Sequence, residues 1–336
     1  MLIVWVKFII CVLAILYAGA RITKYADVIA EKAGLTRAWI GLVLLATITS
    51  LPELANGISA VTLVDAPDLA VGNIFGACLF NMFTIVLLDF LYNLPRGREP
   101  IFCKISSGHL FPASLGMILI GLAALGVILG RIVSISFLNI GLFTFLIAIF
   151  YLIAQRLIYV YEKQRGEIGA IQYEHIEAKE TYIKFIFFAA IVIAAGTWLP
   201  HIGAEMALVM GWGRTFVGSF FLGLATTLPE LVVSISAFRL GVIDMSIGNL
   251  FGSNIFNLGI LFVDDVFYRK AILFQNISIN HAFTLSFLVI MTSMAIAGIV
   301  FKSDKKVFGR LSYPSLIMFI VFLLGFYVLY SLGVRI

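Results

Sequence analysis

Hydrophobic runs long enough to cross a membrane follow one another along the chain. A membrane helix needs about 20 apolar residues to span the hydrocarbon core of a bilayer. Runs of this kind lie at about 1–20, 38–64, 68–93, 109–130, 132–156, 182–201, 214–240, 246–268, 279–300 and 313–334. The pattern therefore predicts an all-α integral membrane protein with ten transmembrane helices, although the nearly continuous stretch 109–156 can also be divided differently.

One long polar segment, residues 157–181, divides the expected helices into two groups of five. We expect an N-terminal five-helix repeat over 1–156, a cytoplasmic linker over 157–181 and a C-terminal five-helix repeat over 182–336. Because five is an odd number, the second group must enter the membrane in the opposite direction. This is an inverted-topology repeat, the arrangement in which many transporters form a binding site at the bilayer midplane.

Two sequence motifs occur once in each half. Residues 46–57 read ATITSLPELANG and residues 72–81 read GNIFGACLFN, whereas residues 223–234 read GLATTLPELVVS and residues 248–257 read GNLFGSNIFN. The first motif places a proline and a glutamate, Glu53 or Glu230, inside an otherwise apolar stretch. An acidic side chain within a membrane span is costly, so we interpret both glutamates as parts of a functional site.

The polar side chains of these motifs share a depth in the membrane. The four that fall near the middle of their expected helices are Glu53, Glu230, Asn81 and Asn257. Pro52 and Pro229 each remove a backbone donor and free a carbonyl group one turn earlier. Irregular backbone at this depth is tolerated where it lines a buried or watery cavity. We therefore expect these groups to meet at one site.

The surrounding residues supply hard oxygen ligands. Hydroxyl groups come from Thr49, Ser50, Thr226 and Thr227. With two carboxylates, two amide oxygens and freed carbonyls, the set suits Ca²⁺, which takes about 6–8 oxygen ligands, or a smaller number around Na⁺. Two facing carboxylates repel each other in an empty site, so one of them is expected to take up a proton or a metal ion.

Composition excludes a soluble globular protein, because 62% of the 336 residues are hydrophobic and only 12% are charged. The chain contains no nucleotide-binding loop, no paired His-Glu metalloprotease motif and no nucleophile motif, so we do not expect an enzyme. The three cysteines are an odd number in or beside apolar segments, which argues against a disulfide framework or a metal cluster. No cofactor is predicted.

The net charge of +5 is explained by membrane topology. Most Lys and Arg residues lie in the loops after the odd-numbered helices. By the positive-inside rule these loops are cytoplasmic and both termini are extracellular, as in a multi-pass protein of the plasma membrane. The basic excess therefore gives no reason to expect a nucleic-acid partner, and nothing indicates an obligate protein partner.

Two aspartates outside the motifs have two possible roles, and the four histidines are not expected to bind a metal. Asp89 and Asp265 are 176 positions apart and are expected at opposite membrane faces. They could attract cations to the two mouths of a pathway, or they could cap helices or pair with Arg96 or Arg269. The four histidines have no partner at metal-ligand spacing, and we expect them to be interfacial or solvated.

At the paired motifs the chain resembles the calcium/cation antiporter superfamily, and within it the prokaryotic sodium/calcium exchangers. The resemblance covers essentially the whole chain and implies antiport by alternating access. It assigns the central glutamates to Glu53 and Glu230 and the hydroxyl ligands to Thr49, Ser50, Thr226 and Thr227. It also assigns carbonyl ligands to Ala46 and Gly223, and the polar positions of the third and eighth helices to Ala77, Asn81, Ser253 and Asn257.

Three positions depart from the pattern of that family. Similar exchangers usually carry serine at Ala77, asparagine at Cys78 and aspartate at Asn257. Two glutamates still balance the charge of Ca²⁺, but the counter-ion is left open. We expect exchange of Ca²⁺ for Na⁺, with H⁺ or another cation as the alternative counter-ion. A cation channel using the same carboxylates is a less favoured alternative.

Overall fold

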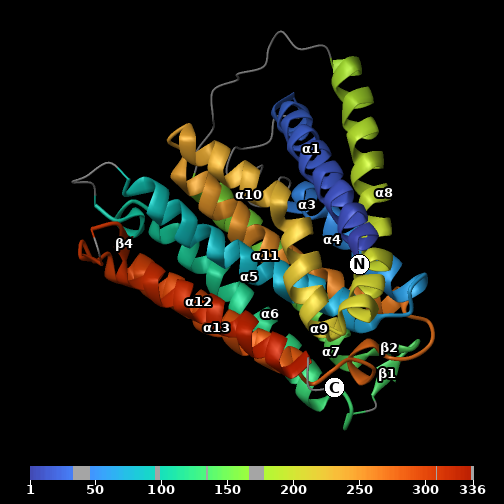
Figure 1. The fold of residues 1–336 in the computed structure, drawn as a ribbon. Coiled ribbons are helices and arrows are strands. Elements are labelled where there is room, and N and C mark those ends of the chain that lie inside the picture. Colours follow the sequence, from blue (N-terminus) through green and yellow to red (C-terminus); the bar gives the residue numbers. More distant parts are fainter. Residues whose placement is uncertain (33–45, 95–98, 134, 166–177, 308, 334–336) are drawn as a thin grey trace.

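The computed structural model describes residues 1–32, 46–94, 99–133, 135–165, 178–307 and 309–333, which are almost entirely helical (Figure 1). In this described part, nine helices are long and apolar enough to cross a membrane by length and composition. Eight are α1 (Leu2–Lys32), α5 (Pro67–Tyr92), α6 (Leu110–Leu129), α7 (Leu142–Arg165), α8 (Ala178–Met210), α11 (Ile243–Phe267), α12 (His281–Phe301) and α13 (Tyr313–Gly333). The ninth joins α9 (Arg214–Val217), the π-helical turn η4 (Gly218–Leu222) and α10 (Gly223–Arg239). The all-α membrane class is thereby confirmed.

The expected helix at 38–64 lies only partly within the described residues. Its described part forms α3 (Ala46–Thr49) and α4 (Leu51–Thr62), which are separated at Ser50. Pro52 occupies the first turn of α4, where a missing backbone donor costs little. Pro229, in contrast, lies inside the continuous helix α10. The count of ten transmembrane helices stays a prediction.

The predicted boundaries of the fifth helix, 132–156, are wrong. Residues Ser136–Phe137 (β1) and Ile140–Gly141 (β2) form a short antiparallel hairpin, and the helix begins only at Leu142. Leu138 and Asn139 have φ angles of 52° and 65° at its turn, a left-handed conformation that no helix of L-residues continues. An equivalent hairpin, β3 (Lys306–Val307) and β4 (Leu311–Ser312), precedes α13.

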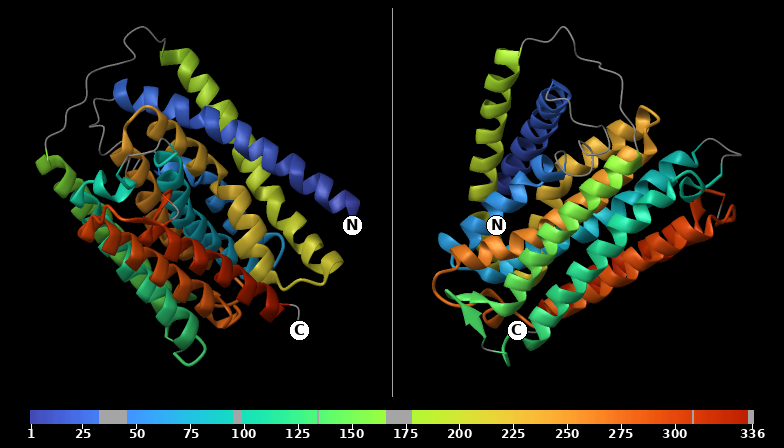
Figure 2. Two further views of the ribbon diagram at one scale, coloured as in Figure 1. Left: turned by 60° about the vertical axis from the view of Figure 1, so that its left-hand side comes forward. Right: turned by 180° about the vertical axis from the view of Figure 1, so that it is seen from behind.

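The central helices are separated from lipid by peripheral ones. The membrane-spanning windows of α5 and of α9–α10 are 78% and 72% buried, whereas those of α7 and α13 are each 28% buried. In Figures 1 and 2, α1 and α8 run side by side on one flank and α12 and α13 on another. An ion pair between Lys7 and Glu205, with a distance of 2.7 Å, joins α1 to α8.

Glycines allow the central helices of the two halves to touch. A Cβ atom on Gly76 would overlap the carbonyl oxygen of Ser219, and one on Gly72 would lie 3.1 Å from the Cα of Gly218. Farther along both helices, a Cβ atom on Gly223 would lie 2.9 Å from the Ala77 nitrogen. The contacts advance together along both sequences, so α5 and the α9–α10 segment run in the same direction.

A similar order of contacts relates α4 to α11. Thr49 meets Ser253, and Gly57 meets Asp264 farther along both sequences. These two helices therefore also run in the same direction.

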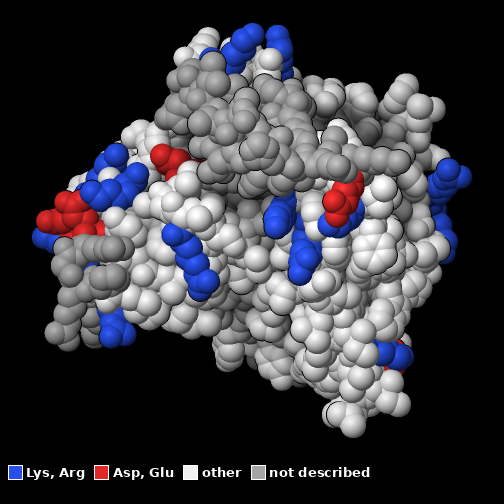
Figure 3. All heavy atoms as spheres, turned by 90° about the horizontal axis from the view of Figure 1, so that it is seen from above, with Lys and Arg blue, Asp and Glu red and all other residues white. Residues whose placement is uncertain are grey.

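The described loops gather at two ends of the molecule. At one end, the Cys103 thiol donates to the carbonyl of Lys302, which joins the loops that follow α5 and α12. At the other end, Lys270 donates to Asp65 at 2.7 Å, which joins the loops that follow α4 and α11. Figure 3 shows Lys and Arg side chains spread over the face seen from above Figure 1, toward which α1 ends and α8 begins.

Asp89 and Asp265 each accept hydrogen bonds from residues of both halves. Asp89 accepts hydrogen bonds from the backbone nitrogens of Ile101 and Ser312 at 3.0 and 2.9 Å. Asp265 accepts from the backbone nitrogens of Leu273 and Gly141 at 2.7 and 2.8 Å, and from the Thr144 hydroxyl. These contacts lie at opposite ends of the molecule. They favour the structural interpretation of both aspartates over attraction of cations.

The expectation that the histidines are interfacial or solvated is wrong for two of them. His281 is completely buried, and its Nε2 atom lies 3.0 Å from Asp68 Oδ1. His109 is also largely buried, and its Nε2 atom lies 3.0 Å from Asp244 Oδ1. The partners lie far away in sequence, in the other half of the chain, so the spacing of residues could not reveal them.

Candidate cation site

The two Pro-Glu segments meet at the centre of the helix bundle. Glu53 on α4 and Glu230 on α10 both have no exposed side-chain surface. Ser50, at the break between α3 and α4, donates a hydrogen bond from its hydroxyl to Glu230 Oε1 at 2.9 Å. The carboxylates of Glu53 and Glu230 are close enough for their charges to interact. The structure therefore brings the matched glutamates together, as the sequence predicts.

In each half a threonine donates to a carbonyl of the preceding turn, although Thr49 corresponds in the repeat to Thr226 and not to Thr227. The Thr49 hydroxyl donates to the carbonyl of Ala46 at 3.2 Å, and the Thr227 hydroxyl donates to the carbonyl of Gly223 at 2.6 Å. Each hydroxyl keeps its oxygen lone pairs free to bind a cation. These pairs place four of the predicted ligand groups beside the glutamates.

The polar residues of α5 and α11 complete the site. Asn81 donates from Nδ2 to Oδ1 of Asn254 at 2.9 Å, which leaves its own oxygen free. Ser253 Oγ lies 3.5 Å from Thr49 Oγ1. Asn257 is completely buried, and the Cys78 thiol lies against it. Cys78 thus takes part in the packing around the site.

Several buried polar atoms of the site have no hydrogen-bond partner among the described residues. They are both carboxylate oxygens of Glu53, Oε2 of Glu230, Oδ1 of Asn81, and Oδ1 and Nδ2 of Asn257. Buried polar groups are normally paired, because an unpaired one loses its hydration without compensation. A cation held by these oxygens would provide that compensation.

The set is built from carboxylate, hydroxyl, carbonyl and amide oxygens. Within the described ranges, no three His, Cys, Asp or Glu side chains gather as a metal cluster. Such a mixed set of hard oxygen donors favours Ca²⁺ or Na⁺ over a transition metal.

Sequence reasoning missed one pair of residues near the site. The Thr226 hydroxyl donates to Asn73 Oδ1 at 2.9 Å. The matching residue of the second half, Asn249, donates to the Ser234 hydroxyl at 3.3 Å. Both asparagines follow the first glycine of the repeated GN(I/L)FG motif, so their duplication was the signal that could have identified them.

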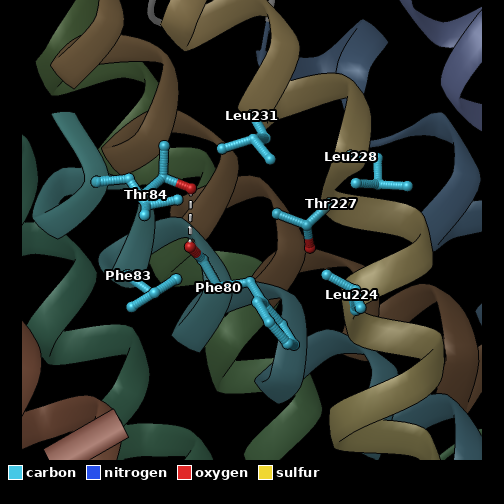
Figure 4. A pocket seen from close by; sticks show the side chains of 8 residues that line it. Phe80, Phe83, Thr84, Leu224, Thr227, Leu228 and Leu231 are labelled. Atoms are coloured by element: carbon cyan, nitrogen blue, oxygen red, sulfur yellow. Dashed lines mark hydrogen bonds between the residues drawn. The ribbon is translucent and has the colours of Figure 1, made fainter. Parts of the chain in front are cut away.

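A small cavity lies beside the site between α5 and α10 (Figure 4). Its volume is about 140 Å³, and Thr227 is the residue that it shares with the site. The other lining residues are Phe80, Phe83, Thr84, Leu87, Leu224, Leu228 and Leu231. The walls are mostly apolar, and only Thr227 connects this space with the predicted ligand set.

The fold and the buried carboxylate site define a multi-pass membrane transporter of the antiporter type. The chain belongs to the sodium/calcium exchanger protein family, whose model matches residues 3–170 and 181–334. The members of this family are secondary transporters and not enzymes. Sodium/calcium exchanger MaX1 of Methanosarcina acetivorans is 26% identical over 298 residues, covering 80% of this chain and 85% of the relative. Inner membrane protein YrbG of Escherichia coli is 25% identical over 267 residues and covers 78% of each chain.

Solved structures share the fold. The H⁺/Ca²⁺ exchanger CAX superposes with a TM-score of 0.71 at 13% identity, covering 99% of this chain and 86% of that one. A structure of the sodium-calcium exchanger NCX_Mj superposes with a TM-score of 0.61 at 20% identity, covering 97% and 99% of the two chains. The same architecture is thus found in exchangers named for two different counter-ions.

Proposed function

We propose that this protein is a secondary active antiporter that exchanges Ca²⁺ for Na⁺ across the membrane by alternating access. The observation that carries the proposal is the contact between the halves at the centre of the bundle. Ser50 of the first half binds Glu230 of the second, beside the buried carboxylate of Glu53. Relative movement of the two halves would therefore change the site directly.

Charge and ligand type favour Ca²⁺ as the cargo. Two carboxylates neutralise one divalent cation, and Ca²⁺ accepts the mixture of hydroxyl, amide and carbonyl oxygens found around them. The proposed ligands are Glu53, Glu230, Thr49, Ser50, Thr226, Thr227, Asn81, Asn257, Ser253, Ala46 and Gly223. In the conformation described, the Thr226 hydroxyl donates to Asn73, which leaves its oxygen lone pairs available for the ion.

The proposed architecture has ten membrane spans in two inverted repeats, residues 1–156 and 182–336, joined by a linker over 157–181. Two features support inversion. The segments α4 and α11 run in the same direction, as do α5 and α10, which is expected if equivalent helix pairs are inverted. The described loops also gather alternately at two ends. An inverted repeat allows one site to open toward either side of the membrane in turn.

The counter-ion follows from the residues that replace the usual polar ligands. Ala77, Cys78 and Asn257 remove a hydroxyl, an amide and a carboxylate from the neighbourhood of the glutamates. We propose Na⁺ as the counter-ion because hydroxyl and carbonyl oxygens remain at Thr49, Ser253 and Gly223. The alternative is Ca²⁺/H⁺ antiport, since relatives of this fold include exchangers named for H⁺.

The protein lies in a membrane, and we propose the plasma membrane with both termini extracellular. The ends of α1 and α10 carry Arg21, Lys24 and Arg239, and by the positive-inside rule these residues support a cytoplasmic location for that end of the bundle. The proposed partners are Ca²⁺, Na⁺ or H⁺ and the lipid bilayer. No nucleic acid and no obligate protein partner is needed.

The test is uptake of radiolabelled Ca²⁺ by proteoliposomes that contain the purified protein. Vesicles loaded with Na⁺ at fixed pH should accumulate Ca²⁺ in a Na⁺-free medium, and dissipation of the Na⁺ gradient with an ionophore should stop uptake. Uptake that follows an imposed pH gradient and ignores Na⁺ would establish the Ca²⁺/H⁺ alternative. Ca²⁺ flux without any counter-transport would indicate a channel.

A further inference from the structure

A second buried carboxylate lies on the contact between α4 and α11, beyond the central site. Asp264 has no exposed surface, and neither of its carboxylate oxygens has a hydrogen-bond partner among the described residues. It packs directly against Gly57, where a Cβ atom would overlap the Asp264 carboxylate. The absence of a side chain at Gly57 therefore makes room for this acid against the backbone of α4.

Comparison with the neighbouring Asp265 shows that burial alone does not account for the unpaired carboxylate of Asp264. Both oxygens of Asp265 are engaged, Oδ1 by the Leu273 nitrogen and Oδ2 by the Gly141 nitrogen and the Thr144 hydroxyl. Asp265 is therefore a structural residue whose charge is stabilised by protein donors. Among the residues that the structure describes, none donates to Asp264, so its single negative charge is the one that needs a ligand.

Asp264 has no counterpart in the other half. By the offsets of the repeated motifs, the positions equivalent to Gly57 and Asp264 are Ser234 and Leu88. The carbonyl of Ser234 accepts a hydrogen bond from the Ser246 hydroxyl at 2.7 Å. Leu88 is apolar. The unpaired acid is thus confined to one side of the central site and is no consequence of the repeat.

The position of Asp264 connects the central site with one end of the molecule. Asp264 is two helical turns, about 10 Å, beyond Asn257 on α11. Gly57 is one turn beyond Glu53 on α4, and between them the amide of Asn56 is also buried with both polar atoms unpaired. The ion pair of Asp65 and Lys270 marks the surface at which α4 and α11 end.

We propose that Asp264 is a second cation site, for a small monovalent cation, between the central site and the end of the molecule at which α4 and α11 terminate. One free carboxylate balances one positive charge, whereas Ca²⁺ would require a second acid that Asp265 does not supply. Oxygen-rich burial favours a hard ion such as Na⁺. The inference rests on the proposed antiport, since the site would bind the counter-ion on its way to or from Glu53.

The test measures Na⁺ binding directly, as the Na⁺ concentration that half-maximally raises the unfolding temperature of the purified protein without Ca²⁺. We expect Asp264→Asn to raise this concentration by about tenfold or more, which corresponds to loss of one charge-assisted contact. Gly57→Ala should act in the same direction, because its methyl group displaces the Asp264 carboxylate. Asp65→Asn removes the same charge from an exposed position at the same end and should change nothing.

Ca²⁺ binding by the same variants separates this inference from the proposed function. Asp264→Asn and Gly57→Ala should retain Ca²⁺ binding within about threefold of the parent protein, because Glu53 and Glu230 are unchanged. That result also establishes that both variants fold. An unchanged Na⁺ response in Asp264→Asn, or an equal loss in Asp65→Asn, would overturn the second site. A stabilisation that depends on pH and ignores Na⁺ would overturn it in favour of a buried protonated acid. If the parent protein binds no Ca²⁺ but its Na⁺ response still requires Asp264, the proposed cargo fails and the second site stands.

Discussion

His281 on α12 lies 3.0 Å from Asp68 on α5, and a matching contact of 3.0 Å joins His109 to Asp244 at the other end of the molecule. The two aspartates are 176 positions apart and the two histidines 172 apart. Each pair joins a residue of the first half to one of the second. The two halves are therefore connected at both ends, and the proposed cation ligands lie between these two connections.

The contact between His281 and Asp68 should contribute measurably to stability. We expect His281→Ala to lower the free energy of unfolding by about 1–3 kcal/mol, because it leaves Asp68 without its imidazole partner. The measurement is the unfolding temperature in detergent. His201→Ala is the control, since His201 is exposed. A loss for His281→Ala no larger than that of the control would contradict the importance of the pair.

The contact of α5 with η4 depends on the absence of a side chain at Gly76. A methyl group there would overlap the Ser219 carbonyl, so Gly76→Ala should separate the helices and lower both the yield of folded protein and Ca²⁺ transport. Gly121→Ala is the matched control, because a Cβ atom there would meet no atom of another described segment within 4 Å. It should be neutral or slightly stabilising, since alanine favours a helix by about 0.5–1 kcal/mol over glycine. Equal behaviour of the two variants would show that the contact is dispensable.

Asp265 should be required for folding and not for ion attraction. Asp265→Ala leaves the Leu273 and Gly141 nitrogens without an acceptor, and we expect a loss of about 2–4 kcal/mol in the free energy of unfolding. Asp304→Ala removes an exposed charge and serves as the control. If Asp265→Ala kept its unfolding temperature and only weakened Ca²⁺ uptake, the cation-attracting interpretation would be restored.

The hydrogen bond from Ser50 to Glu230 should tune the affinity for Ca²⁺. Ser50→Ala removes one hydroxyl ligand and the donor that orients Glu230, so Ca²⁺ binding should weaken by about 5–30-fold, as expected for loss of about 1–2 kcal/mol. Ser114→Ala removes an exposed hydroxyl that donates only to the preceding turn of its own helix, and it should leave binding unchanged. Calorimetric titration with Ca²⁺ distinguishes these outcomes, and wild-type affinity in Ser50→Ala would remove Ser50 from the site.

Most of the central site could be predicted because its residues recur in two copies. Glu53 and Glu230 lie in matched Pro-Glu segments. Because the segment is duplicated, a purely structural role for either glutamate was a poor explanation. Their shared depth in apolar runs then predicted that they would meet. The helix at Leu142–Arg165 could not be placed from hydropathy alone, because the apolar residues before it form a hairpin whose turn requires left-handed backbone.

Contacts between distant residues outside the two repeated motifs could not be predicted from the sequence. Asp68 and His281 are separated by more than 200 positions, and no local pattern distinguishes a histidine bound in another helix from one at the membrane surface. Asp264 is a second residue that the sequence did not identify. Its neighbour Asp265 matches Asp89 by position and was therefore interpreted, whereas the unmatched Asp264 is the acid of this pair that has no hydrogen-bond partner in the described part of the chain.

Ca²⁺ binding to purified Glu53→Gln and Glu230→Gln tests the central claim most directly. If the two glutamates form one site across the halves, either variant should lose about 2–5 kcal/mol of binding free energy, a weakening on the order of 30-fold or more, with an unchanged elution profile. Glu205→Gln, which disrupts only the pair with Lys7 between α1 and α8, should bind Ca²⁺ like the parent protein. Parent-like Ca²⁺ affinity in either Glu53→Gln or Glu230→Gln would contradict the account.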